Sequence, residues 1–162
     1  MYRTLKHLAA VGAVAAVALM GGQAMAATGT GTASVTVATP LVVTHSADLS
    51  FGTIAAGATT GTVSVDAAGS RTATGVTLLG GTPSAGAFHV TGETGQAFNV
   101  SVSTPVSLVS GANSMSAALS VTPATDTVSG SGNTVNVSGT LSVGANQPGG
   151  TYNATYTVTV NY

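Results

Sequence analysis

The sequence contains no cysteine and no tryptophan, and charged residues make up only 4% of its 162 residues. Without cysteine no disulfide can hold the chain together, so the fold depends on side-chain packing and main-chain pairing. Only three residues are lysine or arginine. Proteins that bind nucleic acid or anionic lipid use clustered basic side chains, so the sequence excludes both classes of partner.

Two of the three basic residues lie at the N-terminus, ahead of an apolar run. Arg3 and Lys6 precede the apolar residues 8–20, and small residues follow up to Ala26. This order is typical of a secretory signal peptide and predicts that residues 1–26 are removed. A membrane anchor is the alternative, but the apolar run is too short to cross a bilayer. We therefore expect an exported protein that has no membrane span after cleavage.

Cleavage would leave 136 of the 162 residues, which is the size of one domain. Arg71 then faces four acidic residues, so that one positive and four negative charges give a formal charge of −3. The acidic residues are Asp48, Asp66, Glu93 and Asp126. Abundant glycine, serine and threonine could also indicate disorder. The many β-branched residues, which disordered segments lack, favour a folded domain instead.

The mature chain alternates between apolar and polar residues in short runs separated by glycine- and proline-containing turns. A period of two predicts β-strands, and turns at about ten-residue spacing favour a β-sandwich over a parallel α/β sheet. The predicted strands cover residues 32–39, 41–45, 61–66, 71–79, 87–92, 97–103, 107–111, 115–121, 134–144 and 151–162. We expect an all-β sandwich with Greek-key-type topology at residues 40–162, preceded by an N-terminal extension at residues 27–39.

The last twelve residues show the most regular alternation. One row consists of Tyr152, Ala154, Tyr156, Val158, Val160 and Tyr162, and the other of threonine and asparagine. We expect the first row to face the core, with the tyrosine hydroxyls reaching a polar partner or the rim of the sandwich. Chain ends usually fray unless they are held in place. We therefore expect this strand to lie inside a sheet, beside a neighbour that comes from another molecule.

Gly139 interrupts the row of buried residues expected along residues 135–143. A glycine in a strand marks either a bulge or bend, or a place where another backbone or side chain packs closely. The sequence alone favours the bulge or bend.

Titratable residues are too few and too scattered to predict a catalytic or metal site. His45 lies three residues before Asp48, so a Ser-His-Asp set can be drawn, but no nucleophile-elbow motif accompanies it. His89 alternates with Phe88 and Val90 and is expected to face solvent. Zinc and calcium sites need clustered ligands, which this sequence does not provide. We expect neither enzymatic activity nor a cofactor.

Four stretches carry a resemblance to a known family. They are DLSFGTIAAG (48–57), VDAAGSRTATGVTLLGG (65–81), FHVTGETGQAFNV (88–100) and VSGTLSVGANQPGGTYNATYTVTVNY (137–162). In this order they resemble a family of exported bacterial β domains catalogued as a domain of unknown function, family four-four-zero-two. The resemblance covers nearly the whole mature chain, and the closing stretch is its most specific part.

More distantly, the chain is similar to spore coat protein U and to chaperone–usher pilus subunits. Leu49, Phe51 and Gly52 match an L-x-FG segment of these families, whose last strand also ends in an aromatic residue. The resemblance implies an immunoglobulin-like sandwich that lacks one strand and is completed by the N-terminal extension of the next subunit. It also implies a periplasmic chaperone and an outer-membrane usher as partners, and a location at the bacterial cell surface. The chain lacks the paired cysteines of typical pilins.

Residues 27–38 form an uncharged arm whose small-to-medium apolar residues alternate with serine and threonine. Its candidate donor residues are Ala33, Val35 and Val37, and the candidate wall of the receiving groove is Tyr156, Val158, Val160 and Tyr162. Strand addition of this kind gains affinity from main-chain hydrogen bonds and removes exposed sheet edges. In the alternative, the arm pairs within its own sheet and Pro40 only marks a bend.

These expectations lead to two candidate functions. The first is a non-enzymatic structural subunit of a bacterial surface filament, such as a pilus or fimbria, or of a coat, which polymerises by strand addition. The second is a self-contained secreted β-sandwich that binds a glycan or a surface partner through its loops, as an adhesin does. The two differ in whether the N-terminal arm pairs within its own domain or leaves it.

Overall fold

A computed structural model describes residues 25–162, so residues 1–24 of the predicted signal peptide lie outside the described residues. No helix occurs in the described range, and hence none that could span a membrane. The chain divides into two units. In the first, which ends at Val35, the described residues contain no strand. The second, Thr36–Tyr162, contains all the strands.

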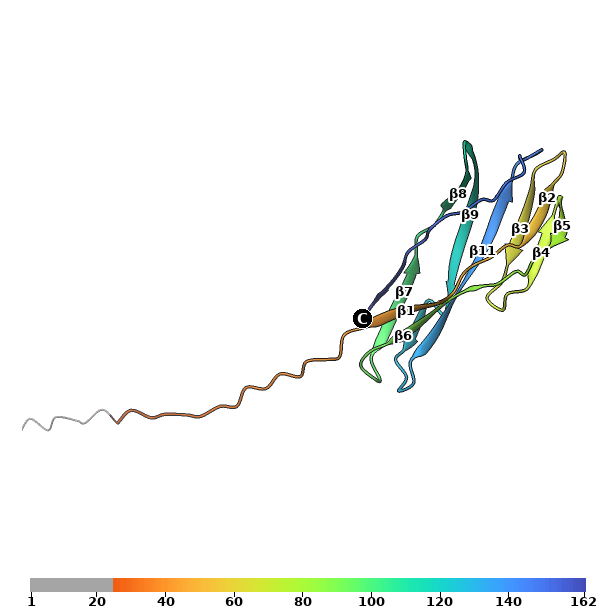
Figure 1. The fold of residues 1–162 in the computed structure, drawn as a ribbon. Helices are drawn as coiled ribbons and strands as arrows, with labels where there is room; N and C mark the ends of the chain where they lie inside the picture. The colour runs from red at the N-terminus through yellow and green to blue at the C-terminus, as the bar shows by residue number, and fades with distance from the viewer. Residues whose placement is uncertain (1–24) are drawn as a thin grey trace, which may run out of the picture. The chain divides into compact units, whose positions relative to one another are not determined.

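Most of the strands are short, β9 and β11 being the longest, and they follow one another closely along the second unit (Figure 1). They are β1 (Val42–Ala47), β2 (Thr53–Ala56), β3 (Gly61–Val65), β4 (Arg71–Thr74), β5 (Val76–Gly80), β6 (Gly86–Thr91), β7 (Ala97–Val102), β8 (Val106–Ser110), β9 (Asn113–Thr122), β10 (Thr125–Thr127), β11 (Asn133–Val143) and β12 (Val158–Asn161).

The largest sheet is built around β11. One edge of β11 pairs with β6 along Asn133–Val137 and then with β3 along Gly139–Val143, while β9 occupies the other edge. Beyond these neighbours, β1 pairs with β6, β4 with β3, and β8 with β9. Every one of these pairings is antiparallel. Along β11, buried residues alternate with more exposed ones, because only one face of the strand is packed against the core.

A second layer consists of a three-stranded sheet, β10-β7-β12, and a two-stranded sheet, β2-β5. Phe98 and Val100 of β7 pack against Val90 and Val135 of the largest sheet and form one closed part of the core. The predicted fold class is confirmed: the second unit is an all-β sandwich of antiparallel sheets.

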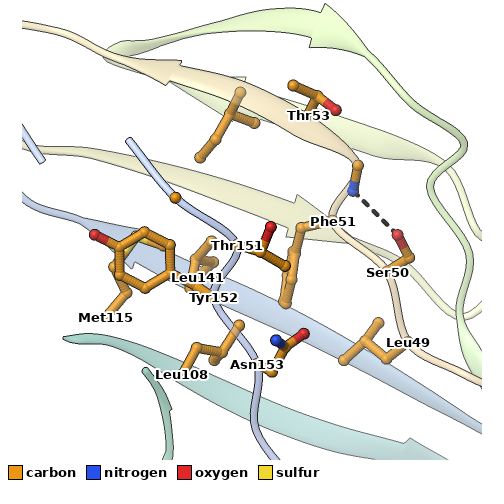
Figure 2. Close-up of a pocket in the computed structure, with 13 residues that line it drawn as sticks. Leu49, Ser50, Phe51, Thr53, Leu108, Met115, Leu141, Thr151, Tyr152 and Asn153 are labelled. Carbon is orange, nitrogen blue, oxygen red and sulfur yellow. Dashed lines mark hydrogen bonds between the residues drawn. The ribbon is translucent and has the colours of Figure 1, made fainter. Parts of the chain in front are cut away.

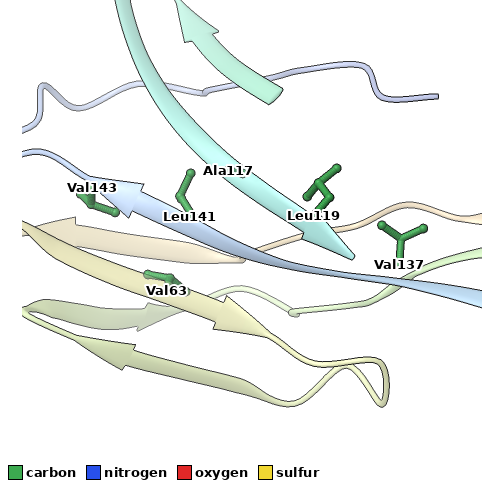
Figure 3. Packing of buried hydrophobic residues seen from close by; sticks show 6 residues of the cluster. All are labelled: Val63, Ala117, Leu119, Val137, Leu141 and Val143. Carbon is green, nitrogen blue, oxygen red and sulfur yellow. The ribbon is translucent and has the colours of Figure 1, made fainter. Parts of the chain in front are cut away.

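The other part of the core is covered less completely. Its fully buried side chains all come from the largest sheet, and Figure 3 shows them: Val63, Ala117, Leu119, Val137, Leu141 and Val143. The side chains packed over them, among them Leu49, Phe51 and Ile54, are themselves only half-buried. The second layer therefore leaves this half of the core open to an additional element.

Several predicted strands differ from the observed ones. Residues 32–39 alternate but form no strand, so the arm does not pair within its own sheet. Residues 71–79 are not one strand, because Gly75 has a φ of 73° and separates β4 from β5, which join different sheets. The closing strand is confined to Val158–Asn161, and the short strands β2 and β10 were not predicted.

Gly139 is a site of close packing, and the predicted bulge or bend is wrong. The pairing of β11 with β9 runs through this residue without a shift in register. A β-carbon at Gly139 would come within 2.9 Å of Leu119 and 3.1 Å of Leu49 and Phe51. The absence of a side chain there lets the chain after β1 lie directly on β11.

Candidate binding groove

The incompletely covered half of the core opens into a groove between two stretches of chain. One wall is residues 48–56, and the other is residues 147–156. Three adjoining hollows of about 300, 460 and 310 Å³ share lining residues along its length. Figure 2 shows the central hollow, with Phe51 on one side and Asn153 on the other. The floor is formed by side chains of β8, β9 and β11: Val106, Leu108, Met115, Leu141 and Val143.

Main-chain pairing and one arginine hold the first wall in place. Ser50 exchanges two main-chain hydrogen bonds with Ser84, at 2.9 and 3.0 Å. Gly52 then turns the chain with a φ of 70°, which a residue with a side chain rarely adopts. Beside this turn, Arg71 Nη1 donates a hydrogen bond to the main-chain oxygen of Phe51 at 2.8 Å. Arg71 therefore fastens the bend at which the wall leads into β2.

The second wall has one paired edge and one open edge. Asn153 exchanges main-chain hydrogen bonds with Val109 of β8, at 2.9 and 3.1 Å. Successive residues of an extended strand direct their main-chain groups to opposite edges, so those of Tyr152, Ala154 and Tyr156 face the groove. Within residues 25–162 none of these three makes a main-chain hydrogen bond to another main-chain group. Such an edge can template an added strand.

Tyr156 closes the end of the groove that is nearer to β12. Its ring meets Phe88 edge-on, with ring centroids 6.1 Å apart, and its hydroxyl lies over Gly86, where a β-carbon would clash with it. The hydroxyl is buried and has no hydrogen-bond partner in the described part of the chain. Burial raises the pKa of Tyr156, and the charge of Asp48 raises it further. For Tyr156, the prediction that the hydroxyl reaches a polar partner or the rim is wrong.

Tyr162 takes part in a different contact, at the start of the domain. Its hydroxyl donates to the main-chain oxygen of Thr39 and accepts a hydrogen bond from the Glu93 amide at 2.8 Å. The Glu93 carboxylate in turn accepts from the Thr39 amide at 3.0 Å, and this bond lowers the pKa of Glu93. We call Thr39, Glu93 and Tyr162 the clamp. The clamp therefore holds Thr39, which follows the arm, against Tyr162, which follows β12.

The predicted site residues lie in four different environments, one of which is the clamp that contains Tyr162. Tyr156 lines the groove, whereas Val158 packs against both parts of the core and Val160 against the closed part. In the arm, Ala33 is exposed, and Val35 and Val37 are 86% and 87% exposed. Of the predicted wall residues, Tyr156 lines the groove, whereas the first wall and the floor were not predicted. The L-x-FG match at residues 49–52 was the one sequence signal that pointed to the first wall.

The groove combines an apolar floor with partly polar walls and carries little charge. Asp48, at the Tyr156 end, is the charged residue among those lining it, and it pairs with His45 at 3.0 Å on the surface. The two side chains of this pair are 92% and 52% exposed. Residues 25–162 contain no group of three histidine, cysteine or acidic side chains that could hold a metal ion. The arrangement is suited to an extended, uncharged segment of polypeptide.

Replacing each of two tyrosines by phenylalanine should have opposite consequences. Tyr156→Phe removes a buried hydroxyl that has no partner, so stability should stay unchanged or rise. Tyr162→Phe removes two hydrogen bonds of the clamp and should lower the free energy of unfolding by about 1 kcal/mol. Urea denaturation of both variants measures this difference. A clear loss of stability in Tyr156→Phe would mean that its hydroxyl has a partner in solution.

Comparison of the chain with curated proteins and with solved structures gives no match in either case. Residues 41–162, which contain both groove walls and all twelve strands, match the family model described as Domain of unknown function (DUF4402). The chain therefore belongs to this family of domains.

Proposed function

We propose that this protein is a non-enzymatic structural subunit of a cell-surface filament, such as a pilus or fimbria, or of a coat, and that it assembles by β-strand addition. The observation that carries the proposal is the groove. Its floor of apolar side chains belongs to the core of the sandwich, yet three adjoining hollows of about 300, 460 and 310 Å³ lie against this floor. Export and a periplasmic chaperone and outer-membrane usher belong to the same proposal.

An inserted strand would pair with the open main-chain edge of the groove and would also cover its apolar floor. Its main chain would pair with the open edge of residues 150–156, and every second side chain would cover the floor. Burial of apolar surface contributes roughly 25 cal/mol per Å², so covering floor residues such as Leu108 and Met115 would stabilise the subunit. The strand would also remove an exposed edge that invites non-specific pairing.

A second candidate function is a self-contained secreted adhesin that binds a glycan. It is favoured by a shallow hollow of about 330 Å³ on the largest sheet, lined mainly by small polar side chains. Ser64 and Thr140 form a hydroxyl pair there, with oxygens 2.9 Å apart. Hydroxyl groups can exchange hydrogen bonds with a sugar, but the hollow has no aromatic residue on which a sugar ring could stack.

Electron microscopy and size-exclusion chromatography of the native, exported protein distinguish the two functions. Filaments, or a ladder of multimers, are the expected result for a subunit that assembles by strand addition. A clean monomer that does not multimerise at high concentration would contradict the proposal and favour the adhesin.

A further inference from the structure

We infer that the groove receives residues 31–37 of a second copy of this chain, running antiparallel to residues 150–156, with Val35 and Val37 over the central hollow and the Gly150 end. This inference rests on the proposed assembly by strand addition, and it specifies which segment enters the groove and in which direction.

The arm has the composition that the groove requires. Residues 31–37 match in length the open edge of the second wall, residues 150–156, at about 3.3 Å per residue. On one face they present Gly31, Ala33, Val35 and Val37, and none of the seven residues is charged. The two valines are almost fully exposed and lie in a stretch without a strand. Burying the apolar surface of these two exposed valines would be energetically favourable.

The arm cannot fill its own groove in this way. The clamp holds Thr39 at Tyr162, and residues 152–162 run extended along β8 and β7, as the pairs Asn153–Val109 and Asn161–Asn99 fix. Tyr152, which lines the central hollow, is therefore about 33 Å along the chain from Tyr162. Val35 is four residues from Thr39 and can reach at most about 14 Å from it. Only a second copy can place its valines over the central hollow.

The direction follows from the linings of the two end hollows, which have similar volumes of about 310 and 300 Å³. The hollow at the Gly150 end is bounded mostly by apolar groups, including Ile54, Met115 and Val143. The hollow at the Tyr156 end is lined by Tyr156, Phe51 and Asn153, and Asp48 lies at its rim. Valine is suited to the first hollow, whose exposed lining is mostly apolar, and glycine to the second, whose exposed lining is more polar. This places the C-terminal end of the arm at Gly150, and the resulting antiparallel pairing is also slightly the more stable kind.

Pairs of engineered cysteines test the direction in a chain that has no cysteine of its own. Thr36 lies on the face of the arm opposite to the valines, and Thr151, Asn153, Thr155 and Thr157 are exposed along the second wall. Directly opposed residues of an antiparallel pair have Cα atoms about 4.5–5.5 Å apart, within the range of a disulfide. We would express the full chain carrying Thr36→Cys with one wall cysteine, isolate the exported protein and oxidise it.

The expected result is a ladder of disulfide-linked multimers for Thr36→Cys combined with Thr151→Cys or Asn153→Cys, and little or none with Thr155→Cys or Thr157→Cys. The single-cysteine variants are the matched controls. A ladder confined to the second pair of variants would overturn the direction but keep the proposed function. If polymers form but Thr36→Cys makes no disulfide with any of the four engineered cysteines of the second wall, the arm is not the segment that occupies the groove. The absence of polymers in every variant and in the parent protein would contradict the proposed function itself.

Discussion

Deletion of residues 27–38 should abolish polymers, and a synthetic peptide of the sequence ATGTGTASVTVA should then bind the truncated protein and restore a stable, soluble monomer. Without the arm no subunit can fill the groove of the next, so assembly stops and each groove stays open. The peptide would bind the folded domain only, and at one hundred times its dissociation constant it would stabilise the domain by about 2.7 kcal/mol. Size-exclusion chromatography and thermal denaturation with and without peptide measure both effects.

Two altered peptides serve as controls for this experiment. A peptide with Val35→Asp should fail, because it would place a carboxylate over an apolar floor, whereas Thr36→Asp on the opposite face should bind nearly as well as the parent peptide. A truncated domain that is fully stable alone and ignores all three peptides would rule out assembly by strand addition.

Val158→Asp should unfold the domain or destabilise it by several kcal/mol, a large part of the roughly 5–15 kcal/mol that stabilises a typical domain. Val158 packs against both parts of the core, so a carboxylate there would lose its hydration without gaining a partner. Thr157→Asp is the matched control, because Thr157 is exposed and the change should cost no more than about 0.5 kcal/mol. Urea denaturation followed by circular dichroism compares the two. Equal losses of unfolding free energy in the two variants would show that the buried and exposed faces of this strand have been assigned wrongly.

Much of the fold could be predicted because alternation records which face of a strand is packed. In residues 151–162 the tyrosines at 152 and 156 and the valines are half-buried, and the threonines are exposed, as the pattern indicates. The pattern fails where a single backbone angle decides the outcome. The positive φ of Gly75 divides an alternating stretch between two sheets, and no periodicity reports it. It also fails for residues 32–39, which alternate as a strand does but have no partner strand in the described chain.

The floor of the groove could not be predicted, because no sequence motif marks it. Leu108, Met115 and Leu141 come from three strands, and each has the sequence context of an ordinary core residue. They form a floor because the hollows of the groove lie beside them, and the position of these hollows depends on where the chain after β1 and the chain before β12 run. Gly139 decides part of that course, because Leu49 and Phe51 rest where its side chain would be.

The clamp gives any polymer of this protein two chemically different ends. The arm emerges beside Tyr162, while its valines fit a distant part of another subunit's groove, so donor and acceptor are separate surfaces. Head-to-tail contacts of this kind build an open filament whenever the rotation between subunits does not close a ring. Elongation would leave one vacant groove at one tip and one free arm at the other. A subunit without an arm could still accept an arm but could not donate one, so small amounts of the truncated chain would act as a terminator and set the length of the filament.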